Sequence, residues 1–136
     1  MSESDKTIID KTDEKISVVI VAFNEESKIR NCILSVSSWA DEIVLVDLQS
    51  NDNTVKIAEE LGAKVYSHEF VPYADPVRPF AVGKASNVWI MMLDADEIVP
   101  RSLANELQKI ANENTFDVVI IPWRNFLFGD EMRYSG

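Results

Sequence analysis

The chain has 136 residues, 46% of them apolar, and 13 Lys and Arg against 23 Asp and Glu give it a formal net charge of −10. This composition is typical of one globular domain that needs no disulfide, and Cys32 has no second cysteine to pair with, which suits a reducing compartment. The acidic balance disfavours nucleic acid and anionic lipid as partners. No apolar run approaches the roughly 18 residues that span a bilayer, and residues 1–15 lack the apolar core of a signal peptide. We therefore expect a cytoplasmic protein, free or peripheral to the inner face of the membrane.

Five apolar runs predict five strands in a domain over residues 16–136, after a polar and flexible tail at 1–15. Runs rich in β-branched residues with few polar interruptions are typical of strands buried on both faces, as in a parallel sheet covered by helices. The predicted strands are 16–23 (ISVVIVAF), 42–47 (EIVLVD), 63–66 (AKVY), 88–93 (VWIMML) and 116–121 (FDVVII).

Three amphipathic helices are predicted between these strands. Asn24 is the expected N-cap of the first helix and Asp52 or Asn53 that of the second, while residues 66–79, with three prolines, predict a long irregular connection. The order of elements predicts an α/β fold with a doubly wound, mainly parallel, Rossmann-like sheet and helices on both faces. The apolar faces of the helices are formed by Ile29, Ile33 and Val36, by Val55, Ala58 and Leu61, and by Leu103, Leu107 and Ile110.

Polar side chains follow three of the predicted strands, at 23–25, 47–50 and 94–97. In open parallel sheets ligands bind beyond the carboxyl ends of the strands, so these groups are expected at one rim. Asp94 and Asp96 offer the carboxylate oxygens that Mg²⁺ and Mn²⁺ prefer, with phosphate and water completing the shell. An isolated D-x-D also occurs in simple capping turns, and its context has to decide between the two.

Glycine loops for phosphate are excluded by the distribution of glycine. The four glycines, Gly62, Gly83, Gly129 and Gly136, are placed so that neither G-x-G-x-x-G nor G-x-x-x-x-G-K-[ST] can be written. A phosphate ligand would have to be held by other groups.

Four linked segments resemble the nucleotide-sugar-binding half of family 2 glycosyltransferases. They are ISVVIVAFNEE, WADEIVLVDLQSNDNTVKIAEELGAKVY, VRPFAVGKASNVWIMMLDADEIVP and IPWRNFLFGDEMRYSG, in the expected order and spacing over residues 16–136. The nearest likeness is to the bacterial subgroup that includes β-glucosyltransferases of lipopolysaccharide core assembly. The resemblance implies a GT-A fold and a role in the synthesis of cell-envelope polysaccharide.

The resemblance assigns nucleotide-sugar contacts to the ends of the first two strands. Phe23, Asn24 and Glu25 match the opening aromatic-Asn-Glu motif, which borders the nucleotide. Asp47 matches the acid at the end of the second strand, expected near the uracil or the ribose.

Further contacts are implied for the segment before the fourth strand and for the D-x-D. Arg78 is implied to face the nucleotide or its diphosphate. Asp96 is implied as a direct ligand of Mg²⁺ or Mn²⁺, and Asp94 as a second metal ligand or a contact to ribose or metal-bound water.

The sequence departs from the family pattern at three places. The loop after Asp47 lacks both usual glycines, so a close approach of its backbone to a ligand is in doubt. Pro79 follows Arg78 where the family usually has Asn, which removes an amide and a backbone donor. The family continues into an acceptor-binding half that carries the catalytic base, which we expect beyond Gly136.

The implied reaction is an inverting transfer from a nucleoside-diphosphate sugar, UDP-linked by expectation, to a hydroxyl of a glycan or lipid-linked acceptor. Two alternatives remain at this point. The chain can be a binding module that is inert without its other half. It can also be a phosphatase with an aspartyl nucleophile, whose D-x-D, however, is expected early in the fold and not after three strands.

Overall fold

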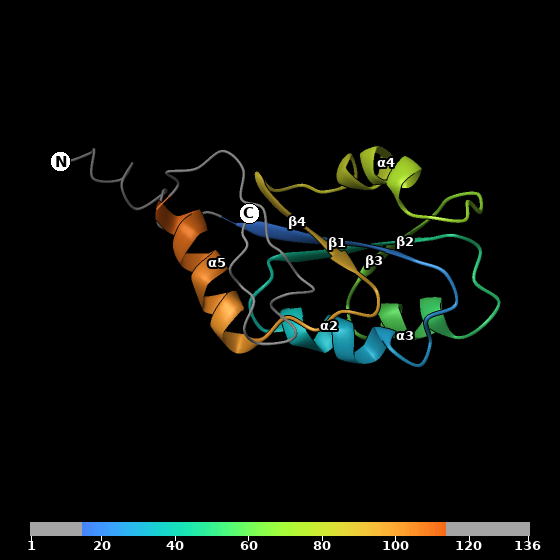
Figure 1. Ribbon diagram of the computed structural model, residues 1–136, viewed down its shortest axis with the longest axis horizontal. Helices are drawn as coiled ribbons and strands as arrows, with labels where there is room; N and C mark the ends of the chain where they lie inside the picture. Colours follow the sequence, from blue (N-terminus) through green and yellow to red (C-terminus); the bar gives the residue numbers. More distant parts are fainter. Residues whose placement is uncertain (1–14, 114–136) are drawn as a thin grey trace.

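A computed structural model describes residues 15–113, and the predicted fifth strand at 116–121 and most of the predicted tail lie outside them (Figure 1). No helix among residues 15–113 is long and apolar enough to cross a membrane. The elements are β1 (Ile16–Ala22), α2 (Ile29–Ser37), β2 (Glu42–Asp47), α3 (Thr54–Glu60), β3 (Lys64–Ser67), the 3₁₀ turn η1 (Asp75–Val77), α4 (Arg78–Val82), β4 (Trp89–Asp94) and α5 (Arg101–Glu113).

The sheet contains four parallel strands in the order β3-β2-β1-β4. The chain moves outward from β1 through β2 to β3 and then crosses to the other side of β1 to form β4. This reversal makes a topological switch point between β1 and β4, where open α/β sheets bind ligands. The predicted α/β class with a doubly wound parallel sheet is confirmed.

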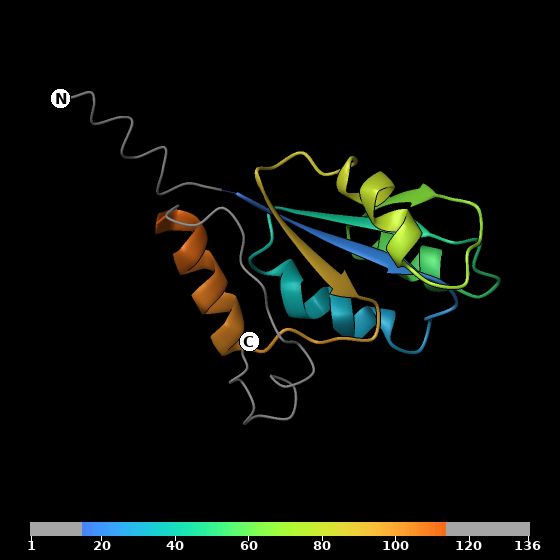
Figure 2. The same ribbon diagram turned by 45° about the horizontal axis from the view of Figure 1, so that its top comes forward.

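Helices cover both faces of the sheet, as predicted (Figures 1 and 2). Residues of α2, α3 and α5 contribute to the larger apolar cluster on one face, and residues of η1 and α4 to the smaller cluster on the other. Successive residues of β1 point to opposite faces of the sheet. Val18 and Ile20 belong to the larger cluster and Val19 to the smaller one. This two-sided burial explains the almost unbroken apolar run of β1.

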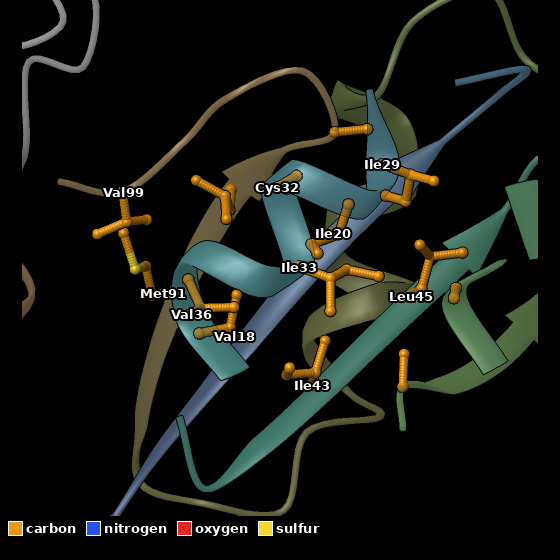
Figure 3. Packing of buried hydrophobic residues seen from close by; sticks show 14 of the residues in the cluster. Val18, Ile20, Ile29, Cys32, Ile33, Val36, Ile43, Leu45, Met91 and Val99 are labelled. Carbon is orange, nitrogen blue, oxygen red and sulfur yellow. The ribbon is translucent and has the colours of Figure 1, made fainter. Parts of the chain in front are cut away.

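The face of α2 that packs on the sheet is the one that the sequence predicts. Ile29, Ile33 and Val36 are fully buried against the side chains of β1 and β2, among them Ile20 and Leu45 (Figure 3). Each fully buried aliphatic side chain of this size contributes about 1.5–3 kcal/mol. These contacts fix α2 on the sheet and so fix the loop that leads into it from β1.

Some boundaries differ from the prediction. β3 and β4 each begin one residue later than expected, and Val88 is 82% exposed because it precedes the sheet. The connection expected to be irregular over 66–79 ends in η1 and in the first two residues of α4. Pro79 is compatible with that helix because it lies in the first turn, where a backbone N–H has no partner within the helix. Pro79 therefore removes no backbone hydrogen bond that α4 would otherwise form.

Candidate functional site

The carboxyl edge of the sheet brings together the acidic residues that end β2 and β4. β1 lies between these strands, with Ala22 paired to Asp47 and Val21 paired to Asp94. Phe23 follows β1 directly, so its position is between the two acids. The sequence motifs at the strand ends therefore meet at one rim, on either side of the switch point.

Asp47 is buried at this rim, and within residues 15–113 only one of its two carboxylate oxygens accepts hydrogen bonds. Its side chain Oδ2 accepts hydrogen bonds from the backbone N–H groups of Gln49 (3.1 Å) and Ser50 (3.0 Å). Its Oδ1 is also buried, yet it has no hydrogen-bond partner among residues 15–113, and the residue is only 6% exposed. A buried carboxylate oxygen without a donor is costly, so a ligand N–H or O–H would find a prepared acceptor here.

The loop after Asp47 adopts a left-handed conformation without glycine. Gln49 has φ 71°, a value that costs a non-glycine residue roughly 1–2 kcal/mol. Its side-chain Nε2 donates to Ser67 Oγ (3.1 Å) and to the carbonyl of His68 (3.3 Å), so the side chain ties this turn to the end of β3. The backbone turn is thus present although the family's usual glycines are missing.

Asn24 is not the N-cap of α2, contrary to the prediction. The helix begins at Ile29, its N-cap is Lys28, and no side chain caps it. Asn24 instead has φ 53°, its backbone N–H donates to Ser50 Oγ (2.8 Å), and its Oδ1 accepts from the N–H of Asn51 (2.7 Å). Asn tolerates this left-handed conformation better than most residues, which suits it to a tight turn. Its side chain is therefore committed to holding the next loop.

Four more hydrogen bonds hold the same two loops, and we call residues 24–26 and 50–54 together the loop bridge. Three of them cross between the loops, from Glu25 N–H to Thr54 Oγ1 (2.8 Å), from Glu26 N–H to Asp52 Oδ2 (3.2 Å) and from Asn53 N–H to Glu26 Oε1 (2.9 Å). The fourth lies within the second loop, where the Thr54 hydroxyl donates to Asp52 Oδ1 (2.6 Å).

Capping of α3 is shared between the two predicted residues. Asn53 is the N-cap by position, without a side-chain cap bond, while Asp52 Oδ1 accepts from the Thr54 N–H (3.0 Å). Burial would raise the pKa of Asp52, but the hydrogen bonds from Thr54 outweigh it and lower that pKa. Sequence reasoning missed the parts played by Glu26 and Thr54. The available signal was the run of short polar side chains in both loops.

Glu25 brings a further carboxyl group to the rim. Burial raises its pKa, and the nearby charges of Asp96, Asp52 and Asp94 raise it further, while Lys28 opposes them. The shift records a concentration of negative charge between the β1–α2 loop and the D-x-D. Such a place favours a bound cation.

A tight turn presents Asp94 and Asp96 to solvent. The Asp94 N–H donates to Glu97 Oε1 (3.0 Å) and the Glu97 N–H donates to the Asp94 carbonyl (3.0 Å). Both aspartates are exposed, and residues 15–113 hold no cluster of three or more His, Cys, Asp or Glu arranged to bind a metal unaided. Two exposed carboxylates with excess negative charge around them still fit Mg²⁺ or Mn²⁺, which take remaining ligands from phosphate and water.

Arg78, at the start of α4, reaches toward the D-x-D. Its Nη1 lies 2.7 Å from Asp75 Oδ1 and its Nη2 lies 3.5 Å from Asp94 Oδ1. The arginine that the family resemblance associates with the diphosphate is thus a neighbour of the first acid of the D-x-D.

Aromatic side chains border the same rim, and sequence reasoning missed one of them. Phe23 (37% exposed) meets Phe70 (50% exposed) edge to face, with ring centroids 4.7 Å apart. In a separate contact, Lys84 Nζ lies 5.1 Å from the ring centroid of Tyr66 and 4.9 Å from that of Phe80. Lys84 is therefore engaged by two rings that connect α4 to β3.

Comparison with known proteins identifies the family. The model of glycosyl transferase family 2 matches residues 17–131. An uncharacterized glycosyltransferase of Rickettsia felis is 41% identical over 97 residues, which are 71% of this chain and 34% of that protein. Glucosyl-3-phosphoglycerate synthase of Petrotoga mobilis is 39% identical over 100 residues, 66% of this chain and 30% of the synthase. The chain thus spans about a third of the length of the curated relatives it matches.

Solved structures of similar fold point the same way. S. aureus TarS in complex with UDP superimposes with a TM-score of 0.63 at 25% identity, over 74% of this chain and 33% of TarS. Glucosyl-3-phosphoglycerate synthase from Mycobacterium tuberculosis, solved with Mn²⁺ and UDP-glucose, gives a TM-score of 0.59 at 27% identity, over 76% of this chain and 40% of the synthase. The chain belongs to glycosyltransferase family 2, a family of enzymes with the GT-A fold.

Proposed function

We propose that this chain forms the nucleotide-sugar-binding part of a glycosyltransferase that uses a UDP-sugar and a divalent cation, Mg²⁺ or Mn²⁺. The observation that carries the proposal is the presence, at the carboxyl edge of the sheet, of the exposed Asp94 and Asp96 and of Asp47, whose buried Oδ1 has no hydrogen-bond partner within residues 15–113. Structures of two relatives of similar fold contain UDP or UDP-glucose, one of them with Mn²⁺.

The nucleoside would lie beside Asp47 and Phe23. Uracil carries one ring N–H donor at N3, and a ribose carries hydroxyl donors, so either would satisfy Asp47 Oδ1. Phe23 offers half-exposed ring surface on which a base can pack. Asn24 and Glu25 complete the nucleotide side of the site through the loop bridge, which holds the turn after Asp47 in place.

The cation would be held by Asp96 directly, with Asp94 as a second ligand or as a contact to ribose or metal-bound water. A carboxylate and a phosphate oxygen about 4 Å apart repel by roughly 4 kcal/mol at an effective dielectric constant near 20. A cation between them turns this repulsion into attraction. When bound, it would also stabilise the negative charge of the departing nucleoside diphosphate.

The rest of the reaction is proposed from the family resemblance. We infer an inverting transfer to a hydroxyl of a glycan or lipid-linked acceptor, with a catalytic base outside residues 15–113. From the same resemblance we propose a place in the subgroup of lipopolysaccharide-core β-glucosyltransferases. The enzyme would then serve cell-envelope polysaccharide synthesis at the cytoplasmic side of the membrane. The binding domain would occupy residues 16–136 after a flexible tail at 1–15.

The test is a calorimetric titration of the 136-residue chain with UDP, with and without Mn²⁺, and with CDP as the comparison ligand. Cytosine lacks the N3–H of uracil, so CDP should bind more weakly if the base meets Asp47. Asp96→Asn should lose the Mn²⁺-dependent part of UDP binding, while Glu59→Gln on the exposed side of α3 should retain it.

A UDP-sugar hydrolysis assay with the same chain completes the test. Binding without turnover would identify a binding module that needs its acceptor half. Equal binding of UDP by the wild type and Asp96→Asn with Mn²⁺, or release of inorganic phosphate from simple esters, would contradict the proposal. The position of the D-x-D on β4, after three strands, already opposes the phosphatase alternative.

A further inference from the structure

Arg78 is placed to compete with a cation for Asp94. We propose that its guanidinium is an internal counter-ion of the D-x-D, which occupies Asp94 in the ligand-free protein and transfers to the diphosphate when the nucleotide binds. The inference rests on the proposed function and deepens it, because it makes the cation and the nucleotide bind cooperatively. It assigns Arg78 a regulatory contact in addition to a contact with phosphate.

The backbone around Arg78 is held by buried neighbours, so the arginine starts from a defined position over the sheet. Val77 before it and Ala81 one turn after it are fully buried in the smaller apolar cluster, together with Met92 packed against that cluster. Asp94 follows Met92 by two residues on β4, which puts its side chain on the same face of the sheet as α4. The ion pair at 3.5 Å follows from this shared face.

Asp75 provides the arginine with a second partner. It precedes Arg78 by three residues, and its Oδ1 lies 2.7 Å from Nη1, so the guanidinium is shared between two carboxylates. Nη1 can keep its ion pair with Asp75 while Nη2 leaves Asp94, so the arginine is not left without a carboxylate partner. The planar fork of Arg also matches two phosphate oxygens, which makes a diphosphate a suitable replacement for Asp94.

Competition follows from charge. A guanidinium beside Asp94 neutralises part of the negative charge that would attract a divalent cation. Its own positive charge also repels that cation. A diphosphate removes this obstacle because it attracts Arg78 and contributes oxygen ligands to the metal. The nucleotide should therefore tighten the binding of the cation, and by thermodynamic linkage the cation should tighten the binding of the nucleotide by the same factor.

The experiment measures Mn²⁺ binding by the electron paramagnetic resonance signal of free Mn²⁺, with and without UDP, so the readout does not depend on activity. Arg78→Gln removes the charge at the site, and Lys109→Gln removes one charge from the exposed surface of α5 as the matched control. Without UDP, Arg78→Gln should bind Mn²⁺ about two- to fivefold more tightly than the wild type, the range of an exposed ion pair, while Lys109→Gln should match the wild type. UDP should increase the affinity of the wild type for Mn²⁺, and this increase should be smaller in Arg78→Gln.

A second variant keeps the test decisive if Arg78→Gln does not fold, which circular dichroism would show. Arg78→Lys retains the charge without the planar fork, so it should keep the weak Mn²⁺ binding of the wild type but lose most of the tightening by UDP. An unchanged or weaker Mn²⁺ affinity in folded Arg78→Gln, or full tightening in Arg78→Lys, would overturn the inference. If the wild type still binds Mn²⁺ and UDP in that case, the proposed function stands; if it binds neither, both fail.

Discussion

Strand β2 has a buried carboxylate at each end, and the two differ in how their oxygens are satisfied. Glu42 at its start receives hydrogen bonds from Ser17 Oγ (2.7 Å), the Ser86 N–H (2.8 Å), Ser86 Oγ (3.0 Å) and Lys64 Nζ (2.9 Å). Asp47 at its end leaves Oδ1 without a donor among residues 15–113. The carboxylate at the start of β2 is therefore arranged for stability, and the one at its end retains an oxygen that a ligand can use.

The pKa values express the same contrast. Burial would raise the pKa of Glu42, but the hydrogen bonds from Ser17, Ser86 and Lys64 lower it to about 2. At the other edge, burial and neighbouring acids raise the pKa of Glu25. The folded protein thus stabilises a negative charge at one edge of the sheet and accumulates excess negative charge at the other.

The largest expected effect is on stability and concerns Glu42, at the start of β2. Glu42→Ala should lower the free energy of unfolding by about 3 kcal/mol, because it removes the buried acceptor of four hydrogen bonds and leaves the fully buried Ser17 hydroxyl without it. Urea denaturation of the variant measures the loss. Glu59→Ala, an exposed glutamate on α3, should change the stability by less than about 0.5 kcal/mol. Equal effects of the two substitutions would remove the distinction between the edges.

Lowering the pH should remove a contribution of similar size. The pKa of Glu42 in the folded protein is about 2 and its ordinary value is 4.5, so its contribution is fully present above pH 4.5 and is lost as the pH falls toward 2. The difference corresponds to at most about 3 kcal/mol. Unfolding curves from pH 6 to 2 should therefore fall more steeply for the wild type than for Glu42→Gln. The raised pKa of Glu25 acts in the opposite direction, because protonation relieves its repulsion.

At the carboxyl edge, binding should change more than stability. Asp47→Asn keeps the shape and keeps an oxygen for Gln49 and Ser50, so the free energy of unfolding should stay within about 1 kcal/mol of the wild type. UDP binding should weaken by about 2 kcal/mol, roughly thirtyfold, because the charged acceptor for the nucleoside is lost. Calorimetry and urea denaturation of one protein sample separate the two quantities. A large loss of stability with unchanged affinity would reverse the interpretation of Asp47.

The smallest expected effect concerns the loop bridge. Asn24→Gly removes the hydrogen bond to Asn51 but keeps the left-handed backbone, and it should cost about 1 kcal/mol. Asn24→Ala should cost about 2 kcal/mol, because alanine adds the strain of φ 53°. Thermal unfolding of both variants gives the difference. Identical losses would show that the backbone conformation at residue 24 relaxes freely.

The sequence was sufficient to predict the four described strands and the face of α2, because burial on both faces leaves the middle of β1 and of β2 without polar residues. It was insufficient for the contacts between loops. Asn24 fits the composition of an N-cap, yet its partner is Asn51, 27 residues away in the chain. The pairing of Arg78 with Asp94 depends on α4 lying over the sheet, which the three prolines of the preceding segment did not reveal.

Glu42 illustrates a signal that was present but weak. A serine in the apolar run of β1 and an acid at the start of β2 are ordinary separately, and only the parallel register sets Ser17 opposite Glu42. Lys64 and Ser86 join them from β3 and from the segment before β4. Register between parallel strands cannot be read from one strand at a time, so this network becomes visible only in the structure.

The loop bridge has a practical consequence for exchanging parts between relatives. Since residues 24–26 and 50–54 hydrogen-bond to one another through side chains of both segments, neither segment carries its conformation by itself. A chimera that imports only one of them from another family member would receive donors and acceptors that do not match. Exchanging either loop of this scaffold for that of a relative therefore requires moving the two segments as a pair.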